Sequence, residues 1–140
     1  MSAVEGNKRV ILVVEDNPTN LMLIRAVLQR AAFEVEGAAS AEEAARWLEK
    51  HRPAVVLMDV QLPGLDGLSL TRQLREQQRT ADLPIIALTA HAMLEDRERA
   101  FSAGCDGYIA KPINTRTLAQ EIEAILDNSG ATSGRQSPHA

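Results

Sequence analysis

The stretch that decides the fold is Val10–Pro18, which has the sequence VILVVEDNP. It begins as a continuous run of aliphatic residues, a pattern typical of a strand that is buried on both faces in a parallel sheet. Two acids follow, and Asn17 with Pro18 predicts a helix N-cap followed by proline at the first helical position. The stretch therefore predicts a buried strand, an acidic turn and a helix, which is how a β-α-β unit begins.

The same alternation continues along the chain. Apolar runs predict further strands at 54–58 and 84–88, with shorter candidates at 33–38 and 108–110. Helical spacing of apolar residues, or a charged helical composition, marks the segments 21–31, 41–48, 68–74, 93–103 and 118–126. Ser40 and Glu43 form a capping-box pattern at the start of the second helix. We therefore expect an α/β fold: a doubly wound, five-stranded parallel sheet of flavodoxin-like (βα)5 type, in the order 2-1-3-4-5, with the second strand at an edge.

Length and composition indicate one globular domain. The chain has 140 residues and a net charge of −4, and we expect residues 8–128 to form the domain, with flexible termini at 1–7 and 129–140. A single cysteine excludes a disulfide framework, and the mild acidity with few aromatics argues against direct binding of nucleic acid. No apolar run is long enough to span a membrane and the N-terminus is polar, so we expect a cytoplasmic protein without membrane contact.

Polar side chains follow the predicted strands at their carboxyl ends, where open parallel sheets bind ligands. Glu15 and Asp16 follow the first strand, Asp59 the third, Thr89 the fourth and Lys111 the fifth. Neighbouring carboxylates repel one another and need a cation, and a set of oxygen ligands without His or Cys favours Mg²⁺. Together with a lysine and a hydroxyl group, they predict a pocket for a phosphoryl group that a carboxylate attacks.

Each of these residues also has a simpler structural explanation. Asp59 could cap a turn, Thr89 could be an ordinary β-branched strand end, and Lys111 could be a solvated surface lysine. Short motifs taken singly give many false positives. Their joint placement at one end of the predicted sheet is what favours a functional site.

Four ordered motifs resemble the receiver domain of two-component response regulators. They are VVEDNPTN (13–20), LMDVQLPGLDG (57–67), IIALTAHAM (85–93) and GYIAKPI (107–113). The resemblance covers about residues 8–128. The motifs are similar to those of single-domain cell-division regulators and of the receivers of hybrid histidine kinases.

The resemblance implies a role for each acidic residue. Asp59 matches the phosphoacceptor, and Asp16 and Asp59 match direct ligands of Mg²⁺, with Mn²⁺ as an alternative ion. Glu15 matches an acid that acts on the ion largely through water, and the backbone carbonyl of Gln61 matches the third protein ligand. Gln61 and His91 occupy positions at which the family varies and tunes the rate of dephosphorylation.

The resemblance also implies roles at the last two strands. Thr89 and Lys111 match the side chains that hold the phosphoryl oxygens, and Pro112 matches a cis Lys-Pro bond. Tyr108 matches the aromatic that swings inward when the threonine moves toward the phosphoryl group. The simpler alternative for Tyr108 is a half-buried tyrosine on a short strand.

The function implied is that of a single-domain response regulator. It would accept a phosphoryl group on Asp59 from a sensor histidine kinase or a histidine phosphotransfer protein, in a Mg²⁺-dependent reaction. It would be a phosphoacceptor with slow autodephosphorylation and not a classical enzyme. Its output would reach a downstream protein effector through the face formed by the fourth helix (93–103), the fifth strand and the fifth helix.

Three other interpretations remain open at this point. The chain could be a receiver excised from a larger hybrid kinase or regulator. It could be an aspartyl-nucleophile phosphohydrolase similar to haloacid-dehalogenase enzymes, although Gln61 stands where those have a second acid. It could also be a flavodoxin-like cofactor binder, although the acidic loop at 15–18 would repel phosphate unless a cation intervened.

Overall fold

The structure is a computed structural model that describes residues 9–62, 66–90 and 93–131. Its strands are β1 (Val10–Val14), β2 (Glu34–Ala38), β3 (Val55–Asp59), β4 (Ile85–Thr89) and β5 (Gly107–Ala110). Its helices are α2 (Pro18–Arg30), α3 (Ala41–Leu48), α4 (Gly67–Glu76), α5 (Leu94–Ala103), α6 (Leu118–Ala131) and a short 3₁₀ turn at Gln78–Thr80. All neighbouring strands are parallel, in the order β2-β1-β3-β4-β5. This confirms the expected doubly wound sheet, with β2 at an edge.

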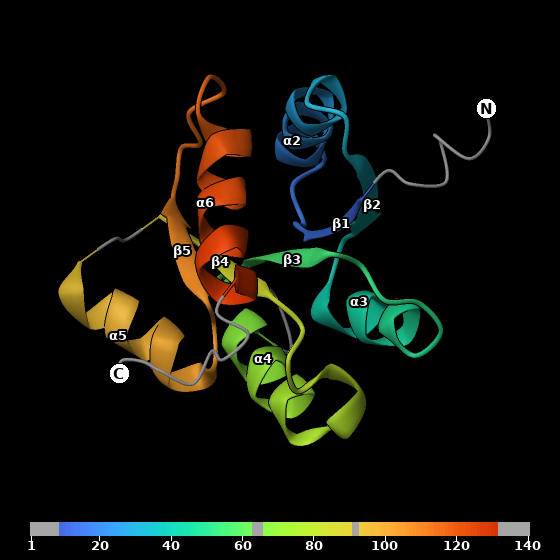
Figure 1. The fold of residues 1–140 in the computed structure, drawn as a ribbon, viewed down its shortest axis with the longest axis vertical. Helices are drawn as coiled ribbons and strands as arrows, with labels where there is room; N and C mark the ends of the chain where they lie inside the picture. The colour runs from blue at the N-terminus through green and yellow to red at the C-terminus, as the bar shows by residue number, and fades with distance from the viewer. Residues whose placement is uncertain (1–8, 63–65, 91–92, 132–140) are drawn as a thin grey trace.

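Helices cover both faces of the sheet (Figure 1). The core on one face includes side chains of α2 and α6, and the core on the other includes side chains of α3, α4 and α5. Successive strand residues supply opposite cores: Val55 and Leu57 belong to the first, and Val56 and Met58 to the second. Because every one of these side chains is buried, the strand appears in the sequence as an unbroken apolar run.

Short polar residues begin α2, α3 and α4. The Asn17 side chain accepts hydrogen bonds from two amides of the first turn of α2, which confirms the predicted N-cap with proline after it. Ser40 accepts from the amide of Glu43, as predicted, but the Glu43 carboxylate accepts from the amide of Ala39 and not from that of Ser40. The capping box therefore closes one residue earlier than the motif suggests. Asp66 caps α4, because its side chain accepts a hydrogen bond from the backbone amide of Ser69 in the first turn.

Element boundaries differ from the sequence predictions by one residue at β3 and β4. Both strands begin and end one residue later than the apolar runs at 54–58 and 84–88, because Asp59 and Thr89 continue the sheet pairing. The last helix continues past Asn128, the predicted domain boundary, as far as Ala131. The termini at 1–8 and 132–140 lie outside the described residues.

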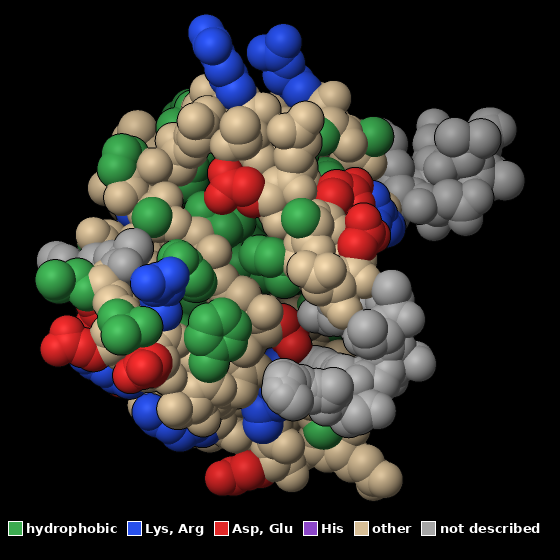
Figure 2. Space-filling view, turned by 60° about the vertical axis from the view of Figure 1, so that its left-hand side comes forward, with side chains coloured by type: hydrophobic (Ala, Val, Ile, Leu, Met, Phe, Trp, Pro, Cys, Tyr) green, Lys and Arg blue, Asp and Glu red, His purple; other side chains and the backbone are tan. Residues whose placement is uncertain are grey.

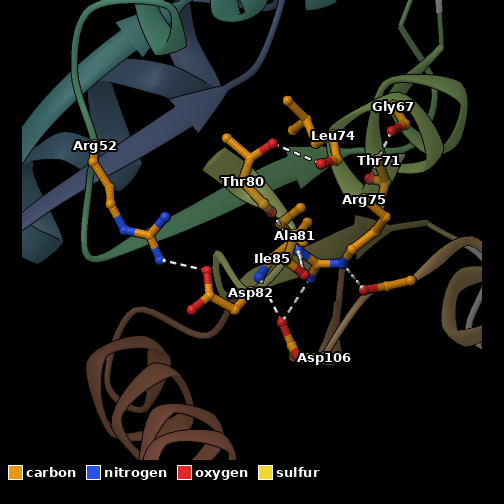
Figure 3. Close-up of polar contacts among 11 residues, drawn as sticks. Arg52, Gly67, Thr71, Leu74, Arg75, Thr80, Ala81, Asp82, Ile85 and Asp106 are labelled. Carbon is orange, nitrogen blue, oxygen red and sulfur yellow. Dashed lines mark hydrogen bonds and ion pairs between the residues drawn. The ribbon is translucent and has the colours of Figure 1, made fainter. Parts of the chain in front are cut away.

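A polar network ties the elements together at the amino ends of β4 and β5 (Figure 3). The guanidinium of Arg75, on α4, donates to the backbone oxygens of Gly104 and Thr80 and pairs with Asp106. The carboxylate of Asp106 also accepts from the amide of Ile85, at the start of β4. This network lies at the opposite end of the sheet from the predicted site and fixes the turn between α5 and β5.

No described helix is both long and apolar enough to cross a membrane.

Candidate functional site

Three carboxylates from two adjacent strands meet at the carboxyl end of the sheet. Ligand oxygens of Glu15, Asp16 and Asp59 all lie within 4.8 Å of one another. Glu15 and Asp59 are buried, whereas Asp16 is exposed. The central β1-β3 pairing brings the first two acids beside the third, as the parallel topology predicts.

Glu15 is held by the turn that leads into α2. Its backbone amide donates to the carbonyl of Ala38 on β2, over 2.9 Å. Its Oε2 accepts from the amide of Asn17 at 3.2 Å and from the side-chain amide of Asn20 at 3.5 Å. The turn that caps the helix therefore also orients the most buried acid of the site.

Lys111 brings a positive charge to the carboxylates from the end of β5. Its Nζ lies 2.8 Å from Oδ2 of Asp59 and 3.3 Å from Oε1 of Glu15. Burial alone would lower the pKa of Lys111, but its hydrogen bond to Asp59 and the two negative charges outweigh that effect and raise the pKa above its usual value. The ammonium group therefore stays charged across the neutral range.

The backbone around Asp59 is tightly packed. Its Oδ1 accepts from the amide of Gln61 at 2.9 Å, which turns the chain immediately after β3. Gly67, the first residue of α4, lies so close that a Cβ atom there would overlap the backbone oxygen of Asp59. The start of α4 thus fixes the position of Asp59, and only glycine leaves room for this approach.

A backbone hydrogen bond links Thr89 and Lys111. Thr89 is the last residue of β4 and is 6% exposed, and its carbonyl accepts from the amide of Lys111 at 2.8 Å. The Lys111–Pro112 bond is cis, as the resemblance implied. The structure thus brings the predicted threonine and lysine to the same edge of the sheet. His91 lies outside the described residues.

Tyr108 lies on β5 and is half-buried against α5. The Tyr108 hydroxyl accepts a hydrogen bond from Arg97 at 2.8 Å, and the Arg97 guanidinium carbon lies 5.3 Å from the centre of the tyrosine ring. The Phe101 ring meets that of Tyr108 edge-on, with the centroids 6.3 Å apart. No sequence pattern singles out Arg97, because it is one of several arginines and acids on a charged helix.

Two hollows border the site, one at Lys111 and one at Thr89. One of about 460 Å³ is lined mainly by apolar atoms, including those of Leu23, Pro112 and Ile113, and it reaches Lys111. The other, of about 320 Å³, lies between α4 and α5 and reaches Thr89. Lys111 therefore borders a mainly apolar hollow, and Thr89 borders one lined by polar and apolar atoms in similar measure.

The donor set fits a hard divalent cation. All three side chains offer carboxylate oxygens, and the described part of the cluster includes no histidine or cysteine. A single lysine faces three acids, so the group carries excess negative charge that Mg²⁺ would balance. Carboxylates, a cation and a fixed lysine beside a hydroxyl form a site suited to accepting a phosphoryl group.

Fold and site together define a receiver of two-component signalling. The chain matches the response regulator receiver domain family over residues 11–123, and it belongs to that family. Members of the family are phosphoacceptors rather than classical enzymes.

Individual relatives agree with this assignment. The chain is 35% identical over 119 residues to the polar-differentiation response regulator DivK of Brucella ovis, covering 85% of this chain and 97% of that protein. A putative response regulator from Chloroflexus aurantiacus has a similar structure, with a TM-score of 0.82 and 36% identity over 86% of this chain and 98% of that one. The receiver domain of the sensor histidine kinase PA1611 of Pseudomonas aeruginosa PAO1 is 41% identical, with a TM-score of 0.75, covering 86% and 96% of the two chains. That structure has a magnesium ion coordinated in its active-site cleft.

Proposed function

We propose that the chain accepts a phosphoryl group on Asp59 from a phosphohistidine of a sensor histidine kinase or a histidine phosphotransfer protein. The observation that carries this proposal is the ion pair between Lys111 Nζ and Asp59 Oδ2, 2.8 Å apart, beside the carboxylates of Glu15 and Asp16. A nucleophilic carboxylate needs nearby positive charge to bind an anionic phosphoryl group, and this arrangement supplies it.

In the proposed reaction, an oxygen of Asp59 attacks phosphorus while the bond from phosphorus to the donor imidazole nitrogen breaks. The electron pair of that bond leaves with the imidazole, and the product is an aspartyl phosphate. Lys111 is already within hydrogen-bonding distance of the attacking carboxylate and would stay beside the new phosphoryl oxygens. The hydroxyl of Thr89, at the adjacent strand end, would donate to one of them.

Asp16 and Asp59, with the backbone carbonyl of Gln61, would hold Mg²⁺ directly, and Glu15 would act largely through water. The ion would neutralise charge on the phosphoryl oxygens during transfer. Glu15 supports this role because it is almost wholly buried and, within the described residues, its Oε1 has no hydrogen-bond partner, although the ammonium of Lys111 lies 3.3 Å away. Mn²⁺ would fit the same set of oxygen ligands.

The proposed output is a change in protein contacts on the face formed by α5, β5 and α6. A phosphoryl group would add about −1.5 to −2 charges beside Thr89, if it behaves as on other side chains. Figure 2 shows that hydrophobic side chains lie among charged ones on this side of the molecule. The N-cap residue Met93 and the α5 residues Leu94 and Phe101 are 66%, 62% and 48% exposed, which is the surface chemistry of a protein-binding face.

Phosphoryl uptake is tested by incubating the protein with Mg²⁺ and acetyl phosphate and measuring its mass, with the Asp59→Asn variant in parallel. We expect one added phosphoryl group on the wild-type protein, none on Asp59→Asn, and loss of uptake when the divalent ion is chelated. Asp82→Asn is the matched control, because Asp82 is exposed at the opposite end of the sheet and, within the described residues, pairs with the exposed Arg52. Persistent labelling of Asp59→Asn would show that another residue is the acceptor.

A further inference from the structure

Tyr108 is held against α5 by one charged residue. Arg97 donates to the Tyr108 hydroxyl at 2.8 Å and lies over its ring at 5.3 Å, so a single side chain contacts both the polar tip and the aromatic face. Phe101, one turn further along the same helix, meets the tyrosine ring edge-on. Two residues of α5 thus fix one residue of β5.

Arg97 has few other partners. Within the described residues, its side chain makes one hydrogen bond, to Tyr108, and its buried Nε has no hydrogen-bond partner. A buried donor without a hydrogen-bond partner costs folding free energy. The contacts of the guanidinium with Tyr108 therefore matter more for its position. Arg99, on the same helix, is instead 62% exposed and pairs with Asp96.

We infer that Arg97 is a positioning residue that holds Tyr108 against α5 and opposes its movement when the site takes up a phosphoryl group. This inference rests on the proposed phosphoryl-dependent switch. Movement of the tyrosine ring away from α5 would break the Arg97 hydrogen bond and the contact with the ring face. The chain would then need part of the phosphoryl-binding free energy to release Tyr108, and Arg97 would set how much.

The contact of Arg97 with Tyr108 would then act as a latch, meaning that it stabilises the present position of the tyrosine ring, and its strength can be measured. Without Arg97, Tyr108 would leave its present position more readily, so the unphosphorylated protein would already populate the switched state. Since a ligand that prefers one state binds more tightly when that state is already populated, the affinity for a phosphoryl mimic would rise.

The chain has a single tyrosine, which makes Tyr108 directly observable. Ring-¹³C-labelled tyrosine gives NMR signals from this residue alone, recorded with Mg²⁺ before and during titration with beryllofluoride, a phosphoryl mimic. The variants are Arg97→Met, which keeps length and apolar contact but removes the donors, and Arg97→Lys, which restores the charge without the planar group. Arg99→Met is the matched control on the same helix.

For Arg97→Met, we expect the Tyr108 signals without mimic to move part of the way toward the beryllofluoride-bound position of the wild type. We also expect the mimic to bind about threefold to tenfold more tightly, as loss of one charge-assisted hydrogen bond implies. Arg97→Lys should lie between Arg97→Met and wild type, and Arg99→Met should match wild type in both measurements.

Two results would overturn the inference and are distinguishable. If the wild-type Tyr108 signals respond to beryllofluoride but Arg97→Met changes neither their starting position nor the affinity, the latch is wrong while the proposed function stands. A lower melting temperature of Arg97→Met without those two changes would assign Arg97 a purely structural role. If the wild-type protein does not bind beryllofluoride at all, the proposed function fails and the latch fails with it.

Discussion

The Nζ atom of Lys111 lies 2.8 Å from Oδ2 of Asp59, a residue 52 positions earlier in the chain. This single ammonium also lies 3.3 Å from Glu15, and the three carboxylates of the site outnumber it. The site is therefore a place where burial and like charge oppose folding unless a cation compensates. This balance gives the first prediction.

Replacing Lys111 with methionine should destabilise the protein most in the absence of divalent ions. We expect the free energy of unfolding in metal-free buffer to fall by about 1–3 kcal/mol, because buried carboxylates lose their positive partner. Added Mg²⁺ should recover part of that loss, since it binds the folded state. Urea unfolding with and without Mg²⁺ measures both effects. Lys50→Met, at an exposed lysine, is the control, and an equal loss in the two variants would contradict the prediction.

Gly67→Ala should disturb Asp59 through the backbone. The added methyl group would overlap the backbone oxygen of Asp59, which cannot move without shifting β3, and would also approach the Met58 side chain. We expect stability to fall by about 1–3 kcal/mol and the affinity for Mg²⁺ to fall with it, measured by urea unfolding and by calorimetric titration. Gly37→Ala is the control, because its methyl group would meet the flexible ends of Leu21 and Arg25. Unchanged Mg²⁺ affinity in Gly67→Ala would refute the link between α4 and the site.

Arg75 should be replaceable neither by lysine nor by methionine. It donates to the carbonyls of Gly104 and Thr80 and pairs with Asp106, in a geometry that only a planar guanidinium spans. We expect Arg75→Lys to lower the free energy of unfolding by about 2–3 kcal/mol, because buried acceptors lose their donors. The exposed Arg72 on the same helix supplies the control, and its lysine variant should be close to wild type. If Arg75→Lys were equally stable, the network would be incidental.

Cys105 should be almost unreactive in the folded protein. Burial raises its pKa to about 11, and the hydrogen bond to Thr71 and the charge of Arg75 only partly offset that effect. At pH 8 the thiolate fraction would then be about a hundredfold smaller than for an ordinary thiol, so alkylation by iodoacetamide should be slower by at least that factor in folded than in urea-unfolded protein. Comparable rates in the two states would show that the thiol is exposed.

The same shift predicts a dependence of stability on pH. Because the folded pKa of Cys105 lies above the unfolded value of 9.0, the folded state keeps its proton at a pH where the unfolded thiol loses it. The contribution of the protonated Cys105 thiol to the free energy of unfolding is complete below pH 9 and is lost as pH rises toward 11. Unfolding curves of wild type and Cys105→Ala between pH 8 and 11 should therefore converge, once other titrations common to both are subtracted. Parallel curves would contradict the raised pKa.

The sequence predicted the sheet well because its central strands are buried on both faces. The first strand was predicted with its observed bounds at Val10–Val14, where apolar side chains coincide with the sheet pairing. The bounds of β3 and β4 were each wrong by one residue, because Asp59 and Thr89 continue the pairing although their side chains are polar. Ending each predicted strand at its first polar residue therefore misplaced the bounds by one residue.

Specific contacts between helices and strands could not be predicted from the sequence. The carboxylates and Lys111 could be placed at one edge because parallel topology alone brings strand ends together. The contact between Arg97 and Tyr108 depends on how α5 is rotated over β5, which no local pattern specifies. The contact of Gly67 with Asp59 likewise depends on a backbone approach between two elements. The roles assigned to the site residues remain predictions until phosphoryl uptake is measured.

The separation of Asp59 and Lys111 along the chain has a consequence for the order in which the molecule assembles. The acids come from β1 and β3 and their turns, near the middle of the sheet, whereas the lysine follows β5 at its far edge. A chain in which β5 has not yet paired with β4 would hold the carboxylates together without their lysine. The charge balance of the site is thus completed only by the last strand of this sheet to be synthesised, so a chain with β5 unpaired lacks a complete site.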